Sequence, residues 1–251
     1  MANIIRSEKR DGAYDDSRRE FLVRALGSGA FVGGMGWNRE ALAGWFGGVP
    51  GKMPEGKSIF DMKGEVLVNG KPASYDTRVS ASDRITTGEG SYVITAVGHT
   101  AFILRERSTL EMGGAELFVR SMRLVSGALL SVFGRRRAED ALKLATPVAT
   151  IGIRGTGVYS EVMPDMSYVC TCYGTTEIAS ASDPRATETV TTTHHNAAKY
   201  ILKEPDSGKL IVPAPFKNHT DLELMTIEAL VGRKVPFAMQ EEQYERPRRD
   251  Y

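Results

Sequence analysis

The chain has 251 residues and a formal net charge of +1, because 32 Lys and Arg residues are almost balanced by 31 Asp and Glu residues. This balance gives no basis for nucleic acid as a partner, since phosphate recognition favours a basic protein. Hydrophobic residues make up 41% of the chain, which is enough to bury a core and excludes a protein that is disordered by composition.

The first 43 residues have the pattern of a twin-arginine export signal. Residues 17–22 read S-R-R-x-F-L and contain the defining pair Arg18 and Arg19. A glycine-rich apolar stretch follows, and then a small-x-small cleavage site at Ala41 and Ala43. We therefore predict a periplasmic protein whose partner during export is the twin-arginine translocase. An uncleaved signal would instead tether the protein to the membrane.

A Gly- and Pro-rich linker over residues 44–58 precedes a predicted β domain over residues 59–180. The strand-like segments are residues 65–68, 91–97, 101–104, 109–112, 117–119 and 129–133. Most of them begin roughly 8 to 12 residues apart, which is typical of a sandwich, barrel or solenoid. The tight-turn dipeptide Asn69-Gly70 ends the first segment. The sequence thus predicts one all-β domain that is β-sandwich-like or β-solenoid-like.

The remainder, residues 181–251, changes in character. Residues 180–193 are rich in Ser and Thr and predict a polar loop or an edge hairpin, which a returning strand follows. A capping box of Thr220 and Glu223 then predicts a short amphipathic helix over residues 221–231. The residues expected on its buried face are Leu222, Met225, Ala229 and Leu230. The last eleven residues are charged and are predicted to be frayed.

Two segments resemble the FecR-like domain family. Residues 66–93, with V-L-V-N-G-K-P-A and D-R-I-T-T-G, are similar to the opening of that domain, and residues 145–157, A-T-P-V-A-T-I-G-I-R-G-T-G, to its most recognisable stretch. The resemblance covers roughly residues 64–180. It implies a β-rich periplasmic domain of a kind often found in regulators that relay an iron-uptake signal to a sigma factor. Here a twin-arginine signal stands where those regulators have an anti-sigma region and an apolar span. Only the periplasmic binding or sensing module is therefore implied.

The second of these segments also has a direct physical interpretation. Gly152, Gly155 and Gly157 permit positive φ or close packing at a tight reversal between apolar strands. Arg154 can bond carbonyls or carboxylates that the reversal leaves open. A phosphate-binding loop is disfavoured, because the segment lacks a Gly-Lys-Ser/Thr ending and a strand pattern resumes directly. The segment is therefore predicted to be a turn.

The candidate for chemistry is the pair Cys170 and Cys172, which lies in an apolar strand-like run. Residues two apart in a strand point to the same face, with Cα atoms about 6.6 Å apart and parallel side chains, so a disulfide is not expected. Two thiolates on one face form half of a soft-metal site. The adjacent His194 and His195 would supply one further ligand, because neighbouring residues face opposite ways. The bound group would be Zn, Cu or Fe, or the iron of a haem.

Other interpretations of the pair remain open. The cysteines could be inert core residues or redox-active thiols. His219, just before the predicted helix, is interpreted as structural, and His99 as part of a turn. The hydrolase elbow, the zinc-protease motif and the dinucleotide fingerprint are all missing from the sequence, so no enzyme is predicted. The leading hypothesis is an exported, non-catalytic FecR-like binding or sensing module, linked to metal or iron-uptake signalling, with an unidentified periplasmic ligand or protein partner. The alternative is an exported metal-binding or redox protein that uses this pair.

Overall fold

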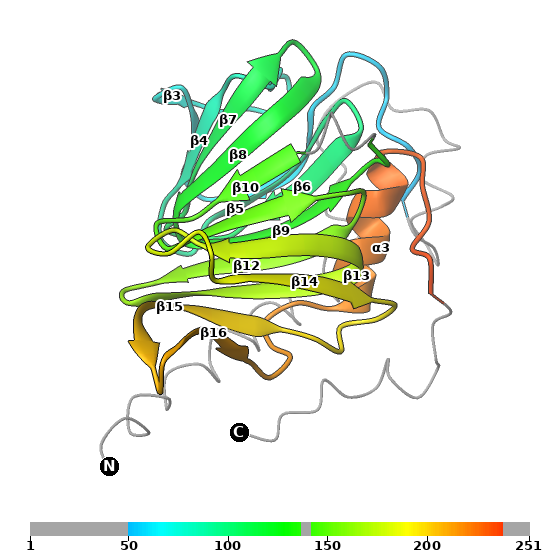
Figure 1. Ribbon diagram of the computed structural model, residues 1–251. Coiled ribbons are helices and arrows are strands. Elements are labelled where there is room, and N and C mark those ends of the chain that lie inside the picture. Colours follow the sequence, from blue (N-terminus) through cyan, green and yellow to red (C-terminus); the bar gives the residue numbers. More distant parts are fainter. Residues whose placement is uncertain (1–49, 137–141, 238–251) are drawn as a thin grey trace. The chain divides into compact units, whose positions relative to one another are not determined.

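The computed structural model describes residues 50–136 and 142–237. The predicted export signal at residues 1–43 and the predicted frayed tail lie outside the described residues, so both stay predictions. The chain divides into two units, Met1–Gly51 and Lys52–Tyr251, and the second contains every described strand and the one described helix. The predicted all-β fold with a short C-terminal helix is confirmed (Figure 1). None of the helical structure described is long and apolar enough to cross a membrane.

The strands form one continuous sheet whose two halves share a long strand, β13 (Met166–Ser180). Its residues up to Tyr173 pair with strands of the first half, and those from Gly174 onward pair with strands of the second. Gly174 has a φ of 84°, and a Cβ atom there would lie 2.7 Å from the Thr156 side chain. Glycine is therefore required where β13 changes partners.

Both halves are almost entirely antiparallel, and among the strands of residues 50–136 and 142–237 only β8 and β10 pair in parallel. The first half contains, in hydrogen-bonded order, β1 (Ile59–Lys63), β5 (Tyr92–Val97), β6 (Thr100–Leu104), β9 (Ala128–Phe133), β12 (Gly157–Met163), the start of β13, β15 (Lys199–Asp206) and β16 (Lys209–Pro213). The second half contains the end of β13, β11 (Ala149–Ile153), β10 (Leu142–Ala145), β8 (Phe118–Ser126), β7 (Thr109–Ala115), β4 (Arg84–Thr87), β2 (Val66–Val68) and β3 (Lys71–Pro72). The predicted Asn69-Gly70 turn joins β2 to β3, with positive φ at both residues.

The main core lies between the two halves of the sheet. Fully buried side chains reach it from both halves, for example Phe102 and Leu129 from the first and Leu110 and Leu144 from the second. Burial of this apolar surface is the dominant favourable contribution to folding. Of the two architectures left open by the sequence, the arrangement is the sandwich-like one.

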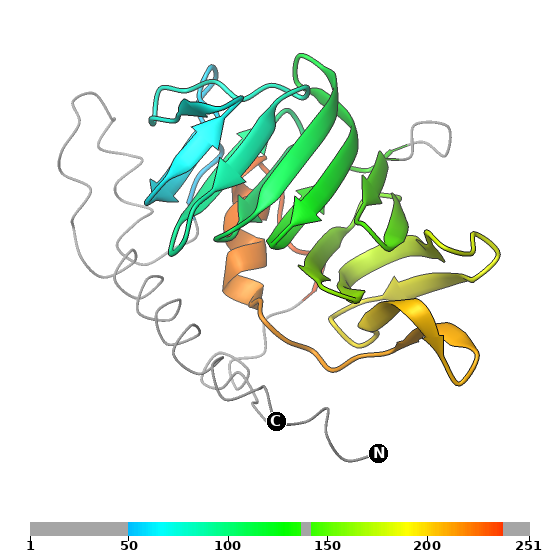
Figure 2. The same ribbon diagram turned by 90° about the vertical axis from the view of Figure 1, so that its left-hand side faces the viewer.

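A second core lies on the opposite side of the first half, under the helix α3 (Asp221–Leu230). In β5, Val93 and Val97 join the main core, whereas Ile94 and Ala96 join the second core. The helix packs across β5, β6 and β9 (Figure 2). Both faces of these strands are therefore buried, which explains why their sequences are apolar at nearly every position.

The helix begins at the capping box, but the predicted buried face was wrong at three of four positions. The Thr220 hydroxyl accepts from the Glu223 N–H at 3.3 Å, and the Glu223 carboxylate accepts from the Thr220 N–H at 2.9 Å. Leu230 is buried as expected, but the other three predicted residues are only half-buried. Leu224 and Ile227 are fully buried in their place. A buried ion pair between Glu223 and Arg105, at 2.8 Å, turns this side of the helix toward the sheet.

Residues 180–193 form the edge hairpin, which was one of the two alternatives drawn from the sequence. Strand β14 (Thr187–Thr192) pairs with the end of β13, and its Val190 reaches the main core. The sheet then continues through β15 and β16 as far as Pro213, in the region after residue 180 where a returning strand was predicted. At the other end, the Met53 N–H donates to the Leu230 carbonyl at 2.9 Å, so part of the predicted linker contacts the domain.

Candidate metal centre

Cys170 and Cys172 lie in the middle of β13, on the side of the sheet that faces α3. Both are fully buried in the second core, whereas Val169 between Tyr168 and Cys170 joins the main core on the other side. This separation follows from the two-residue period of a strand. The two cysteines are free and form no disulfide. Both sulfurs therefore project into one apolar space between the sheet and the loops that flank the helix.

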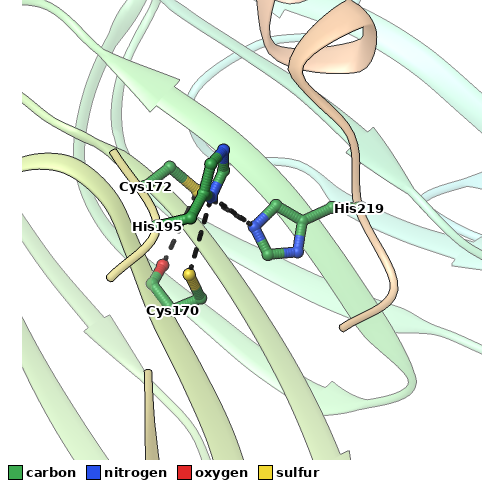
Figure 3. Close-up of side chains that lie close together, drawn as sticks. All are labelled: Cys170, Cys172, His195 and His219. Carbon is green, nitrogen blue, oxygen red and sulfur yellow. Dashed lines mark hydrogen bonds between the residues drawn. The ribbon is translucent and has the colours of Figure 1, made fainter. Parts of the chain in front are cut away.

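Two loops bring imidazole rings to these sulfurs (Figure 3). His195 follows β14, and its N–H donates to the Cys172 carbonyl at 3.0 Å, which holds the loop against β13. Its Nδ1 atom lies 3.7 Å from the Sγ atom of Cys170. His219 directly precedes the N-cap of α3 and stacks on Tyr159, with ring centroids 4.6 Å apart. Its Nε2 atom lies 3.4 Å from the Sγ atom of Cys172.

The donor atoms of Cys170, Cys172, His195 and His219 all lie within 4.8 Å of one another. Of the predicted ligands, the structure thus brings together both cysteines and one of the two adjacent histidines. His194 points elsewhere, with its Nε2 atom 2.9 Å from each carboxylate oxygen of Asp221. From the sequence, His219 was not placed in this cluster, because a residue beside a helix start is more often structural. The sequence signal that could have identified His219 is the capping box directly after it, which fixes the position of this segment.

The outer nitrogens of the two imidazoles have well-defined partners. The Nδ1 atom of His219 lies 2.7 Å from the Lys217 carbonyl, and the Nε2 atom of His195 lies 2.9 Å from an Asp221 oxygen. A carbonyl or carboxylate oxygen only accepts, so each of these nitrogens carries the proton. When each ring is neutral, its other nitrogen presents a lone pair to the cluster. These two nitrogens, Nε2 of His219 and Nδ1 of His195, are 3.1 Å apart.

Two lone pairs at this distance repel each other unless a cation lies between them. A shared proton or a metal ion would satisfy both nitrogens. Imidazoles that ligate metals typically donate their other N–H to a carboxylate or a carbonyl, which fixes the tautomer and the ring orientation. Both His195 and His219 have this arrangement here.

The protonation of the two thiols differs. The hydrogen bond with Cys172 holds the pKa of the Cys170 thiol well below its usual range; burial opposes this effect, and His219 and His195 add to it. Burial raises the pKa of the Cys172 thiol well above its usual range, and the neighbouring Cys170 raises it further. Burial lowers the pKa of His195, but the bonds to Asp221 and Cys170 outweigh burial and raise it overall. The metal-free cluster therefore favours one thiolate rather than two.

The predicted glycine motif lies near the cluster and does not join it. Gly155 has a φ of 82° in the connection between β11 and β12, and Arg154 there lies 3.8 Å from Glu177. A Cβ atom on Gly157 would lie 2.6 Å from the Tyr173 ring and 3.1 Å from Leu224. Gly157 thus permits the close approach of α3 to the sheet, whereas Gly152 has only ordinary contacts. The predicted export residues Arg18, Arg19, Ala41 and Ala43 lie outside the described residues.

His99 is separate from the cluster. Its carbonyl accepts from the Gly134 N–H and from the Arg233 side chain, at 3.2 and 2.8 Å. It belongs to the turn between β5 and β6, as the sequence suggested. This histidine therefore serves as a control position for experiments on the metal centre.

No family model matches the sequence. No curated protein matches it significantly. Two similar solved structures are crystal structures, at 1.65 and 2.50 Å resolution, of a proposed anti-sigma factor from Parabacteroides distasonis. Their sequences are 12% and 11% identical to this chain, and both have a TM-score of 0.42. The match covers 52% of this chain and 58% of theirs, so this chain spans little more than half the length of the proteins it matches.

Proposed function

We propose that this protein binds one transition-metal ion, with Zn²⁺ as the best candidate, through Cys170, Cys172, His195 and His219. The observation that supports the proposal most strongly is the pair of imidazole nitrogens that face each other at 3.1 Å, each with its outer N–H already bonded. A divalent ion between these nitrogens and the two sulfurs would satisfy all four donors at once.

The distances within the cluster agree with a tetrahedral site. Zinc bonds of about 2.0–2.1 Å to nitrogen and about 2.3 Å to sulfur hold two nitrogens about 3.3 Å apart, and a nitrogen and a sulfur about 3.6 Å apart. The corresponding distances here are 3.1 Å between the nitrogens, and 3.4 and 3.7 Å between nitrogen and sulfur. These three distances therefore match a tetrahedral site to within a few tenths of an ångström, and the remaining donor atoms of the cluster are no more than 4.8 Å apart.

Four protein ligands favour a structural role for this metal. A catalytic zinc site usually has three protein ligands and leaves the fourth position to water or substrate. Here the fourth position is supplied by the chain, and Cys170, Cys172 and His219 are all buried. A haem is disfavoured, because a porphyrin fills four positions of its iron and leaves at most two for the four clustered donors. Cu and Fe remain chemically compatible with two thiolates and two imidazoles.

The resemblance of residues 64–180 to the FecR-like family supports a second, coarser element of the proposal, a role in regulation or sensing. In this proposal the metal fastens the loops around α3 to the sheet of an exported, non-catalytic sensing module. The S-R-R-x-F-L segment supports export through the twin-arginine route, which carries folded proteins and is commonly used by those loaded with a cofactor in the cytoplasm. Its ligand or protein partner would be met in the periplasm.

Metal content decides the proposed function. Untagged protein, purified without chelators, should contain about one equivalent of Zn by elemental analysis. Cys170→Ser, Cys172→Ser and His219→Ala should each reduce this content strongly, whereas His99→Ala should leave it unchanged. Two thiols that titrate freely in metal-free protein of full thermal stability would refute the proposal.

Export has a separate test. The double variant Arg18→Lys/Arg19→Lys keeps the charge and removes the twin-arginine pair, so it should accumulate inside the cell. Cell fractionation with the wild-type protein as control measures the difference. Equal amounts of both proteins in the periplasmic fraction would exclude this route.

A further inference from the structure

A second group of metal-binding side chains adjoins the cluster on its outer side. The Nε2 atom of His194 lies 2.9 Å from both carboxylate oxygens of Asp221, and the Nε2 atom of His195 lies 2.9 Å from one of them. The three donor groups lie within 4.8 Å of one another. The side chains of His194 and Asp221 are 30% and 20% exposed, so this group borders on solvent, unlike the buried cysteines.

We infer that His194, His195 and Asp221 form a second metal site, called the open site because it borders on solvent. It shares His195 with the buried four-ligand site proposed above, called the closed site. The two nitrogens of one imidazole point in opposite directions, and here Nδ1 faces the thiols whereas Nε2 faces Asp221. One ring can therefore bridge two ions. The bridging role of His195 rests on the proposed function, because Nδ1 of His195 binds a metal only in the closed site.

The charges of the two sites balance. In the closed site, Cys172 releases its thiol proton to solvent as the ion binds, and the two thiolates then neutralise one divalent ion. In the open site, the Asp221 carboxylate and the negative charge of a bridging imidazolate neutralise a second. The proton that Nε2 of His195 donates to Asp221 is released to solvent when the ion takes its place, as is usual when a metal displaces a proton from its ligand.

The ligand types indicate which ions the open site would take. Two imidazoles and one carboxylate suit Zn, Cu, Ni, Co and Fe, and leave coordination positions free for water. Phe237 packs against His194 and Phe216 packs against His195, with ring centroids 4.5 and 4.6 Å apart, so aromatic rings limit how the two imidazoles can move. A site with three ligands at the surface should exchange its ion faster than a buried site with four.

Cobalt titration of the full, untagged chain distinguishes the two sites. Bound Co²⁺ absorbs strongly in the near ultraviolet only when thiolates are its ligands. Equilibrium dialysis with elemental analysis counts the ions, and absorption reports how many are bound to sulfur. The wild-type protein should bind two equivalents, of which one gives the thiolate absorption.

Three variants and a control complete the test. His194→Ala and, as a second variant, His194→Gln should bind one equivalent and keep the thiolate absorption. The double variant Cys170→Ser/Cys172→Ser should lose the absorption and keep one equivalent, and His99→Ala should match the wild type. A wild type that binds one equivalent with thiolate absorption would overturn the second site and leave the proposed function intact. Retention of two equivalents by both His194 variants would also overturn it. One equivalent that lacks the absorption and is lost on His194→Ala would instead refute the proposed function alone.

Discussion

Arg105, next to the end of β6, and Glu223, in the first turn of α3, form an ion pair at 2.8 Å with both side chains more than nine-tenths buried. Arg105 also donates to the Asn218 carbonyl at 3.3 Å, directly before His219. One guanidinium thus holds the helix and the loop that carries a proposed ligand. This pair links the second core to the candidate metal centre.

Glu223→Gln should therefore destabilise the protein strongly. The amide can keep the cap, but it leaves the buried Arg105 charge without its carboxylate, which typically costs about 3–5 kcal/mol. Urea unfolding with the metal content held constant measures the change in free energy. Arg185→Gln, which removes the exposed pair of Arg185 and Asp183, is the control and should show no measurable change. Similar losses in both variants would contradict this interpretation of the buried pair.

The sequence predicted the fold class because its signals are local. Alternating apolar segments, the Asn69-Gly70 turn and the capping box at Thr220 each depend on a few neighbouring residues. The face that α3 presents to the sheet could not be predicted from neighbouring residues, since it depends on Arg105, more than a hundred residues away in the sequence. A buried face predicted from apolar residues alone does not include a polar residue such as Glu223, so the sequence pattern favoured the face that contains Leu222.

The candidate site was predictable only in part, for the same reason. Cys170 and Cys172 share a strand face by the period of the strand, which the sequence gives directly. The choice between His194 and His195 depends on the bend after β14, where His195 has a φ of 44°. His219 comes from a third segment and joins the cluster only because the helix docks on the sheet. Contacts between distant segments of this kind leave no periodic signal in one sequence.

Asp61 should make the stability depend on pH in the mildly acidic range. Burial raises the pKa of its carboxyl group, and hydrogen bonds from the hydroxyls of Tyr92 and Tyr75 only partly oppose this. Between the ordinary carboxyl pKa and the raised one, the folded state binds more protons than the unfolded state, so stability falls as pH rises through this interval. Below the ordinary value both states are protonated, and this contribution is fully present.

Asp61→Asn removes the titration; its amide oxygen still accepts from one tyrosine hydroxyl, and its NH2 group can donate to the hydroxyl oxygen of the other. Unfolding free energies measured at intervals from about pH 4 to about pH 7 should therefore fall less steeply in the variant than in the wild type. The comparison uses the difference between the two slopes, so titration elsewhere in the chain cancels. Parallel curves would show that the folded state does not shift this carboxyl group.

The turn between β11 and β12 should tolerate alanine at one glycine and not at another. Gly155 has a φ of 82°, and a Cβ atom there would lie 2.9 Å from the Cα atom of Arg135. Gly155→Ala should therefore cost about 1–3 kcal/mol through backbone strain and crowding. At Gly152, in β11, an added Cβ atom would have no neighbour closer than 3.6 Å, so Gly152→Ala should be neutral or slightly stabilising. Thermal unfolding of the two variants side by side tests the difference, which a Gly155→Ala variant as stable as the wild type would contradict.

The docking of α3 can be tested with two leucines that lie two positions apart. Leu224 is fully buried against the sheet, whereas Leu222 is half-buried on the other side of the helix. Leu224→Ala should cost about 2–5 kcal/mol, because it removes buried apolar surface and leaves a cavity beside Tyr173 and Gly157. Leu222→Ala should cost less than about 1 kcal/mol, since alanine keeps the helix and little buried surface is lost. Denaturant unfolding with an unchanged m-value gives both free energies. Equal losses, or a larger loss for Leu222→Ala, would mean that the helix presents the face expected from the sequence and not the one seen here.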